Sequence, residues 1–329
     1  MRKEYGGCFF PRDLQERQFI EFPAEGFTHQ AAGVIFKGGM AVDGVPLGGL
    51  GTGYLVPNSD GNLGKCTIFN AWPKPQDLNL PFLALVLGSE PRILTLKPPE
   101  DLKGTVDIHY WGHYPFADLQ YVLDLPLQVS LRAFAPFVPG DAETSNTPAV
   151  IFRTRLANLG DKPLTGCLAF AFPGPTPHEG ETFTRSDFTN KEDGLTGVEV
   201  KHGRGVGYAI GVIQAKAAVK HGMALGTEAT PWATLEKGLQ IASSTHPGTA
   251  VSIDFAVTPG AYMDVDFVLA WFYPYFRDSD GMPHEHRYIN RFKSPADVAR
   301  FVAEDHGDLL RRSLAWQEVI YQSEFPPWL

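Results

Sequence analysis

The segment LPLQVSLRAF, Leu125 to Phe134, decides the fold class because its apolar and polar side chains alternate. Successive side chains of a β-strand point to opposite faces, so this period of two predicts a strand with one face in the core and one in solvent. The expected inward set is Leu127, Val129, Leu131 and Ala133, and the expected outward set is Gln128, Ser130 and Arg132.

The next two runs along the chain show the same pattern. AVIFRTRLAN, from Ala149, alternates so that Ile151 faces away from Val150, Phe152 and Leu156. The turn LGDKP over residues 159–163 leads into LTGCLAFAF over residues 164–172. Two alternating runs joined by a short turn of Gly, Asp and Pro predict a β-hairpin.

Two further strands are expected nearer the C-terminus. TAVSIDFAV, from Thr249, repeats the alternation, whereas VDFVLAWFYP, from Val265, is apolar throughout. A continuous apolar run predicts a central strand that is covered on both faces. Between Pro173 and Gly194 the chain is polar and rich in turn residues, which predicts a long loop off the sheet edge.

The composition agrees with an all-β protein. The chain has 34 Gly and 27 Pro, which favour turns, and 23 Phe, 11 Tyr and 6 Trp, which favour pleated surfaces. Hydrophobic residues make up 43% and charged residues 20%, as in soluble globular proteins. A chain of 329 residues can form one large β domain, so we predict an all-β, antiparallel fold.

The last part of the sequence predicts a long helix. Ser294 is a suitable N-cap, Pro295 fits the first helical position, and Asp297 suits the first turn. A stripe with a period of about 3.6 residues follows and predicts one helix over residues 295–322, which Pro326 and the next proline end. The stripe comprises Val298, Phe301, Val302, Leu309, Leu310, Ser313, Trp316, Gln317 and Ile320.

Charge and cysteine content exclude several classes of protein. The net charge is −9 with no basic run, which argues against nucleic-acid binding. No apolar run reaches the roughly 18 residues of a membrane span, and the N-terminus lacks the apolar core of a signal peptide. Cys8, Cys66 and Cys167 have neither disulfide nor metal-ligand spacing, and Cys167 is expected to be buried in a strand. We therefore predict a cytoplasmic protein without a metal or cofactor.

The glycine-rich segment GVPLGGLGTGYL, Gly44 to Leu55, resembles a nucleotide-binding loop only in its glycine density. Such a loop joins a strand to a helix, but the following residues, VPNSDGNLG, are typical of β-turns. The segment also lacks the Lys-Ser/Thr pair of a P-loop. We instead expect a tight backbone path between strands, where side chains would clash.

Three clusters of His and Asp lack the spacing of a metal site. The segment over residues 109–114, HYWGHY, predicts aromatic packing in a strand and turn. Asp278 to Gly281 begins like a calcium loop but does not continue as one, and Pro283 to His286 lacks a third ligand. Both are expected to be solvated loops. There is no G-x-S-x-G motif, and none of the 37 acidic residues has a diagnostic setting, so no catalytic residue is assigned.

Several segments, in order, resemble glycoside hydrolase family 116, which includes non-lysosomal glucosylceramidases and bacterial β-glucosidases. PLGGLGTGYL, from Pro46, is similar to the family's PLGGIGTG opening, and HRYINRF over residues 286–292 is similar to its R-Y-Y-T-R-F-F. Residues 114–163 resemble its segment with a Leu-Pro strand, an acidic loop and a strand ending in N-x-x-D. The late Trp of the closing helix and the PPWL after it look like the family's linker. The resemblance extends from about residue 40 to residue 329.

The resemblance implies a large two-sheet antiparallel β-sandwich of the supersandwich kind, over residues 1–293. Residues 294–329 would be the linker helix and the lead-in to a catalytic (α/α)6 barrel that this chain does not contain. In the family, the barrel carries the glutamate nucleophile and the aspartate acid/base for retaining hydrolysis of β-glucosides or glucosylceramide. The implied function is thus that of a non-catalytic domain that supports this barrel, with a β-glucoside or other glycan as ligand. As a connector, the helix should leave part of its stripe over residues 298–320 exposed.

Two other functions are compatible with the sequence. A stand-alone carbohydrate-binding module would stack exposed aromatic rings on sugars. Trp72, Trp111 and Trp232 are the candidates, although a buried core position is the favoured expectation for each of them. A self-contained glycan-active enzyme would show two facing carboxylates with perturbed ionisation in a concave pocket.

Overall fold

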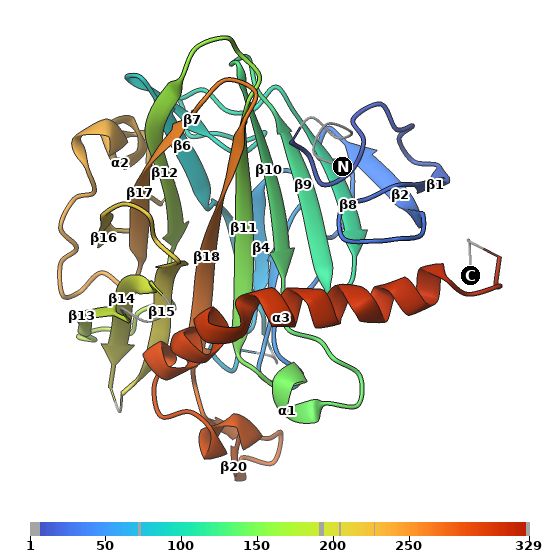
Figure 1. The fold of residues 1–329 in the computed structure, drawn as a ribbon. Helices are drawn as coiled ribbons and strands as arrows, with labels where there is room; N and C mark the ends of the chain where they lie inside the picture. Colours follow the sequence, from blue (N-terminus) through green and yellow to red (C-terminus); the bar gives the residue numbers. More distant parts are fainter. Residues whose placement is uncertain (1–6, 72–73, 191–193, 204, 227, 327–329) are drawn as a thin grey trace.

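The structure is a computed structural model that describes residues 7–71, 74–190, 194–203, 205–226 and 228–326. Two antiparallel sheets face each other and enclose the main core, and the long helix α3 (Pro295–Tyr321) crosses the outer face of the larger sheet (Figure 1). This arrangement confirms the predicted all-β, two-sheet antiparallel fold with a C-terminal helix.

The larger sheet has ten strands. Their order is β1 (Phe19–Phe22), β2 (Ala31–Lys37), β8 (Asp107–His113), β9 (Phe116–Val122), β10 (Leu127–Phe134), β11 (Ala149–Asn158), β18 (Tyr262–Phe272), β15 (Val206–Ile213), β14 (Thr196–His202) and β13 (Phe183–Thr189). The facing sheet has five strands, in the order β16 (Val219–Met223), β17 (Thr249–Val257), β12 (Leu164–Phe172), β6 (Leu83–Leu87) and β7 (Glu90–Ile93).

The remaining strands form two smaller sheets. One is a three-stranded sheet of β3 (Leu55–Pro57), β4 (Asn62–Cys66) and β5 (Gln76–Pro81), and another is the hairpin of β19 (Tyr275–Arg277) and β20 (Pro283–Glu285). The short helices are α1 (Ala142–Ser145), α2 (Ala229–Ala233) and two 3₁₀ turns, Leu235–Lys237 and Arg287–Asn290. In the described part of the chain, no helix is long and apolar enough to cross a membrane.

The main core lies between the two sheets and is rich in aromatic side chains. Phe152 of β11 and Phe267 of β18 meet Phe170 of β12, with ring centroids 4.8 and 5.4 Å from that of Phe170. The predicted inward residues of β10 also belong to this core. The apolar run of β18 is buried on both faces, as predicted for a central strand, because α3 covers its outer side.

The prediction that one face of β10 meets solvent is wrong, because all eight residues of the strand are buried. Gln128, Ser130 and Arg132 lie under the N-terminal segment and α3, which sequence periodicity cannot reveal. Their polar atoms are paired: Gln128 Nε2 donates to Tyr121 O over 3.1 Å, and Ser130 Oγ donates to Gly7 O over 3.5 Å. A polar stripe on a strand therefore marks a buried polar layer here.

The predicted hairpin of residues 149–172 is also wrong. β11 lies between β10 and β18 in the larger sheet, whereas β12 lies between β17 and β6 in the smaller one. Asn158 stabilises the connection from the larger to the smaller sheet, since its Nδ2 donates to Lys162 O over 2.7 Å and to Val257 O over 2.9 Å. Both strands are apolar enough to be central strands, and each therefore takes two neighbours in its own sheet.

The segment over residues 173–194 contains an edge strand as well as the predicted loop. β13 pairs with β14 at the end of the larger sheet, and its Phe183 and Phe188 are buried while most of its polar residues are exposed. The polar composition that suggested a loop thus belongs in part to a strand with one face in water.

Helix α3 begins as predicted and ends one residue earlier than expected. Ser294 Oγ accepts a hydrogen bond from Asp297 N over 3.1 Å, and Pro295 occupies the first turn. The expectation that part of the stripe stays exposed is confirmed only at its C-terminal end, because residues such as Val298, Val302 and Leu309 are buried. Only its C-terminal end is open, where Ile320 is 51% exposed.

Glu318 fastens the C-terminal end of α3 to the N-terminal segment. Its carboxylate accepts hydrogen bonds from Thr28 N over 3.0 Å, Thr28 Oγ1 over 2.6 Å and His29 N over 2.9 Å. Burial alone would raise the pKa of Glu318, but the hydrogen bonds from Thr28 and His29 outweigh it and lower the pKa from 4.5 to about 2. The ionised carboxylate is therefore the form that joins the two segments.

We expect this junction to weaken in acid. A depressed pKa stabilises the folded state fully above the unfolded value, and the contribution is lost as the pH falls from about 4.5 to about 2. Glu318→Gln should be less stable than the wild type near neutral pH, and this difference should vanish toward pH 2. Thermal unfolding against pH measures it, with Glu304→Gln, at an exposed position of α3, as the control. A difference that is independent of pH would contradict the assignment.

Candidate functional site

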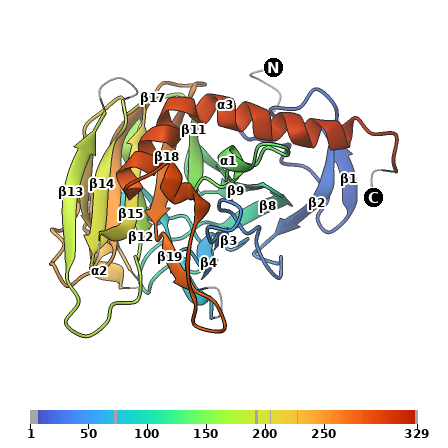
Figure 2. The same cartoon turned by 90° about the horizontal axis from the view of Figure 1, so that it is seen from below.

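A pocket of about 420 Å³ lies beside the glycine-rich segment, and we call it the glycine pocket. Residues 46–54 form one wall. The sheet of β3 and β4 and the hairpin of β19 and β20 lie side by side at this end of the sandwich (Figure 2). The side chains that complete the wall are Tyr54, Thr67, Asn70, Tyr114, Phe276 and His286.

The glycines of this segment are required by close backbone contacts. A Cβ atom on Gly48 would lie 2.1 Å from Gly53 O, and one on Gly49 would lie 2.4 Å from Thr147 O. Gly53 has a φ of +94° and would place a Cβ 2.7 Å from Ile68 Cα. The predicted tight path between strands is confirmed, because any side chain at these positions would collide with backbone.

Trp271 of β18 fixes the glycine segment to the main core. Its indole Nε1 donates to Thr52 O over 2.8 Å, and its ring is fully buried. The backbone of the segment is closed by two further hydrogen bonds, from Leu47 N to Leu55 O and from Leu55 N to Leu47 O, over 2.8 and 2.9 Å. The pocket wall is thus a rigid loop that the central strand holds in place.

Asn70 and His286 join the opposite wall. Asn70 Nδ2 donates to Tyr273 O over 3.0 Å and to Tyr275 O over 2.8 Å, so its Oδ1 is left to accept from His286 Nε2, 2.9 Å away. Burial lowers the pKa of His286, although a hydrogen bond to the backbone of Gly51 opposes this effect. Burial therefore disfavours the charged form of the imidazole, which forms part of the pocket wall.

The two clusters near the C-terminus are only partly the solvated loops that the sequence predicts. Asp278 caps the exposed β19–β20 turn by accepting from Asp280 N over 3.0 Å and from His284 Nε2 over 2.7 Å. Glu285 is also exposed. His286 differs, because it is partly buried in the pocket wall and its ring stacks on Phe276 with centroids 4.7 Å apart.

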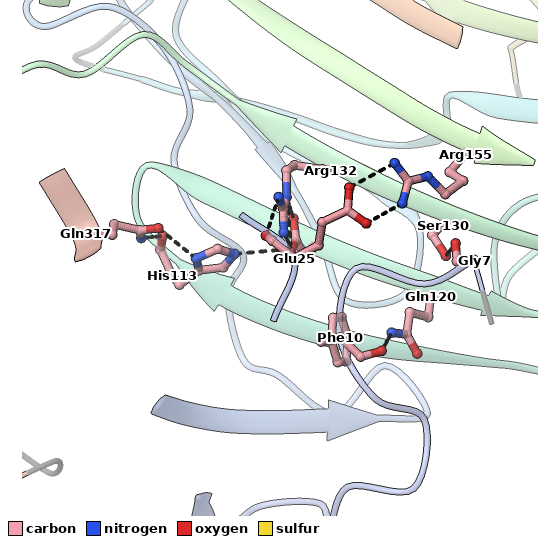
Figure 3. Close-up of polar contacts among 10 residues, drawn as sticks. Gly7, Phe10, Glu25, His113, Gln120, Ser130, Arg132, Arg155 and Gln317 are labelled. Carbon is pink, nitrogen blue, oxygen red and sulfur yellow. Dashed lines mark hydrogen bonds and ion pairs between the residues drawn. The ribbon is translucent and has the colours of Figure 1, made fainter. Parts of the chain in front are cut away.

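A buried charged network lies on the outer face of the larger sheet (Figure 3). Arg132 faces Asp118 across β10 and β9, and its Nη2 donates to Asp118 Oδ2 over 2.7 Å. Its Nη1 donates to Glu25 O over 3.0 Å. Arg155 pairs with the Glu25 carboxylate, over 2.9 Å between Nη2 and Oε1, and with Asp264, over 2.7 Å between Nε and Oδ1. The network joins the N-terminal segment to the sheet.

The same network extends to α3 through His113. His113 Nε2 lies 3.4 Å from Asp118 Oδ2, and its Nδ1 lies 3.1 Å from Gln317 Oε1. Burial lowers the pKa of His113 even though Asp118 opposes this effect. The pKa of Asp118 is lowered in turn, because Arg132 and His113 outweigh its desolvation. The network is buried and paired within the chain, so we assign it to folding.

The aromatic candidates of the carbohydrate-binding alternative are not surface rings where the structure describes them. Trp111 and Trp232 are fully buried, and Trp111 stacks on His113 with centroids 3.5 Å apart. Trp72 lies outside the described residues. The segment over residues 109–114 is mostly strand β8, as predicted. Cys167 is only partly buried, contrary to expectation, while Cys8 and Cys66 are buried.

None of the described residues that line the glycine pocket is Asp or Glu. Among the described residues, no group of three or more His, Cys, Asp or Glu side chains is placed to hold a metal ion. The glycine pocket can therefore bind a molecule but offers no pair of carboxylates for glycoside hydrolysis.

The sequence predicted the tight backbone path of the glycine segment, but it did not predict the pocket beside it. Thr67, Asn70 and Phe276 come from segments without a motif, whereas Tyr54 belongs to the glycine segment and Tyr114 to the segment over residues 109–114. The sequence signals near the remaining wall residues were HYWGHY, which ends at Tyr114, and Pro283 to His286, which was expected to be a solvated loop.

Comparison with known proteins gives one family and several distant structures. The sequence model described as "beta-glucosidase 2, glycosyl-hydrolase family 116 N-term" matches residues 44–309. None of the curated proteins compared with the chain matches it. A solved structure described as a kojibiose phosphorylase from the human microbiome is similar at TM-score 0.39 and 9% identity, over 98% of this chain and 37% of that one.

Two other solved structures are similar to the chain at a comparable level. A bacterial glucoamylase complexed with acarbose has a TM-score of 0.48 and 9% identity, over 95% of this chain and 40% of that one. A solved structure described as an aldose 1-epimerase from Klebsiella pneumoniae subsp. pneumoniae has a TM-score of 0.30 and 11% identity, over 83% of this chain and 81% of that one. The chain spans about two fifths of the length of the phosphorylase and the glucoamylase.

Proposed function

The chain belongs to the N-terminal domains of glycosyl-hydrolase family 116, and from this premise we propose that it is the non-catalytic β-sandwich of a β-glucoside-cleaving enzyme. The match over residues 44–309 carries the proposal, because it includes most of both sheets and the first half of α3. The carboxylate-free wall of the glycine pocket supports the non-catalytic role.

The proposed partner is a catalytic (α/α)6 barrel of the glucosylceramidase or β-glucosidase type. In this proposal, residues 1–293 form the supporting sandwich and residues 294–329 lead into the barrel. The barrel would supply the nucleophile and the acid/base, while the sandwich would hold the barrel and border its substrate cleft. The three free cysteines support a reducing, cytoplasmic location.

An activity assay on the purified chain tests the non-catalytic role. We expect no turnover of 4-nitrophenyl β-D-glucopyranoside above the background rate, because retaining hydrolysis requires two carboxyl groups about 5 Å apart around the scissile bond. A catalytic family 116 enzyme that contains its barrel serves as the positive control. Turnover by this chain that a single Asp→Asn or Glu→Gln substitution abolishes would overturn the proposal.

The reading frame that follows Leu329 tests the proposed partner. A long helical repeat with an acidic residue in each catalytic role is expected there. A different catalytic domain in that frame would contradict the assignment of a barrel.

A further inference from the structure

The wall of the glycine pocket carries no Asp, Glu, Lys or Arg side chain among its described residues. Its side chains are the aromatic rings of Tyr54, Tyr114 and Phe276, together with polar groups. Burying a charged ligand would leave its charge without a side chain of opposite charge, which is unfavourable. The pocket is therefore suited to an uncharged molecule, and its volume of about 420 Å³ is within the range of small-molecule sites.

The backbone of the glycine segment adds hydrogen-bond donors to this wall. In the described chain, the N–H groups of Gly49, Gly51 and Gly53 have no hydrogen-bond acceptor, and Gly49 is buried. Buried backbone donors without a partner are rare in folded proteins, so a missing partner is expected at this position. A ligand with several hydroxyl or ether oxygens would provide the acceptors.

Three polar side chains of the wall, Asn70, Thr67 and His286, are already engaged within the protein. Asn70 is saturated by Tyr273 O, Tyr275 O and His286, as described above. Thr67 Oγ1 accepts from Tyr54 N over 2.9 Å. These bonds fix the shape of the pocket before any ligand arrives, which reduces the entropy lost on binding. The recognition chemistry is left to the aromatic faces and the glycine amides.

We propose that the glycine pocket binds the uncharged pyranose ring of a saccharide. A pyranose has an apolar C–H face that can lie against an aromatic ring, and a rim of oxygens that can accept hydrogen bonds from the backbone amides. Under the proposed function, this ligand is the sugar of the enzyme's own substrate. Only this identification of the ligand rests on the proposed function; the binding of a sugar ring does not. The pocket would then be the part of the sandwich that borders the substrate cleft.

Phe276 is the side chain that best tests this proposal. It lies on β19 at the pocket wall, outside the hydrophobic cores, and contacts His284 and His286. Its neighbour Tyr275 is on the same strand, is 61% exposed and does not line the pocket. The pair Phe276→Ala and Tyr275→Ala therefore removes one ring from the pocket and one from the nearby surface.

Titration of the full chain with methyl β-D-glucopyranoside, followed by amide NMR, is the experiment. We expect saturable shifts of the amides of Gly49, Gly51 and Gly53. Phe276→Ala should weaken binding by about tenfold, as for the loss of one buried ring contact, whereas Tyr275→Ala should leave it unchanged. Glucose 6-phosphate should bind more weakly than the glucoside, because the wall has no Lys or Arg for its phosphate among the described residues.

Three results would overturn the proposal. They are no saturable shift with the wild type, shifts that map away from the glycine segment, or equal weakening in Phe276→Ala and Tyr275→Ala. Thermal unfolding checks that each variant folds, and Tyr54→Leu replaces Phe276→Ala if the latter does not. This binding experiment is independent of turnover. If the chain neither binds the sugar nor hydrolyses it, this inference is wrong and the proposed non-catalytic function is still supported.

Discussion

Replacing Arg132 with methionine is expected to lower the free energy of unfolding by about 3–5 kcal/mol, the typical loss when one partner of a buried ion pair is removed. Asp118 has no exposed surface and Arg132 is only 2% exposed. The substitution would leave the Asp118 carboxylate buried, with the imidazole of His113 as its remaining polar neighbour. It would also remove the hydrogen bond to Glu25 O, which anchors the N-terminal segment.

Denaturant unfolding of a matched set of variants measures this effect. The double variant Arg132→Met with Asp118→Leu should recover most of the lost stability, because the buried charge is then gone together with its partner. Asp118→Leu alone should be destabilised like Arg132→Met, since it leaves an unpaired guanidinium. If Arg132→Met lies within about 1 kcal/mol of the wild type, the network is not the buried junction that the geometry indicates.

Trp271→Ala is expected to cost about 3–5 kcal/mol of stability, the usual range for truncating a fully buried aromatic residue. The ring lies in the main core on the central strand β18 and is 0% exposed. Its Nε1 is also the donor to Thr52 O, so the variant should loosen the glycine segment as well as the core. Thermal or denaturant unfolding measures the first effect, and hydrogen exchange at residues 52–55 measures the second.

Trp271→Phe separates packing from the hydrogen bond. It retains much of the apolar volume but leaves Thr52 O without its donor, for which about 1–3 kcal/mol is expected. Faster exchange in residues 52–55 should therefore appear in both variants, with the larger loss of stability only in Trp271→Ala. Unchanged exchange in Trp271→Phe would show that the indole N–H does not hold the segment.

The sequence predicted the strands and the helix that are determined by residues close to one another in the chain. The alternation of residues 127–134, the apolar run from Val265 and the Ser-Pro-Ala-Asp start of α3 each have a physical reason within a few residues. What covers a strand's second face is not local. Arg132 looked like a solvent-facing residue because its partners, Asp118 and Glu25, are brought to it by the fold.

The choice of strand partners and the full pocket could not be predicted for a similar reason. The turn after Asn158 has the composition of a hairpin, yet the neighbour of β11 is β18, more than a hundred residues later in the chain. The glycine segment was found because close backbone contacts restrict residue type. Phe276 and Asn70 were missed because an aromatic ring or an amide has the same appearance in any loop of the sequence.

The position of β18 in the sequence has a consequence for folding during synthesis on the ribosome. β11 is complete at Asn158, but the strand that pairs with its second edge begins at Tyr262. At roughly 5–20 residues per second, translation leaves that edge open for roughly 5–20 seconds. An open strand edge is a template for another nascent chain. Misassembly of newly made copies is therefore expected to begin at β11, an edge that the finished molecule no longer has.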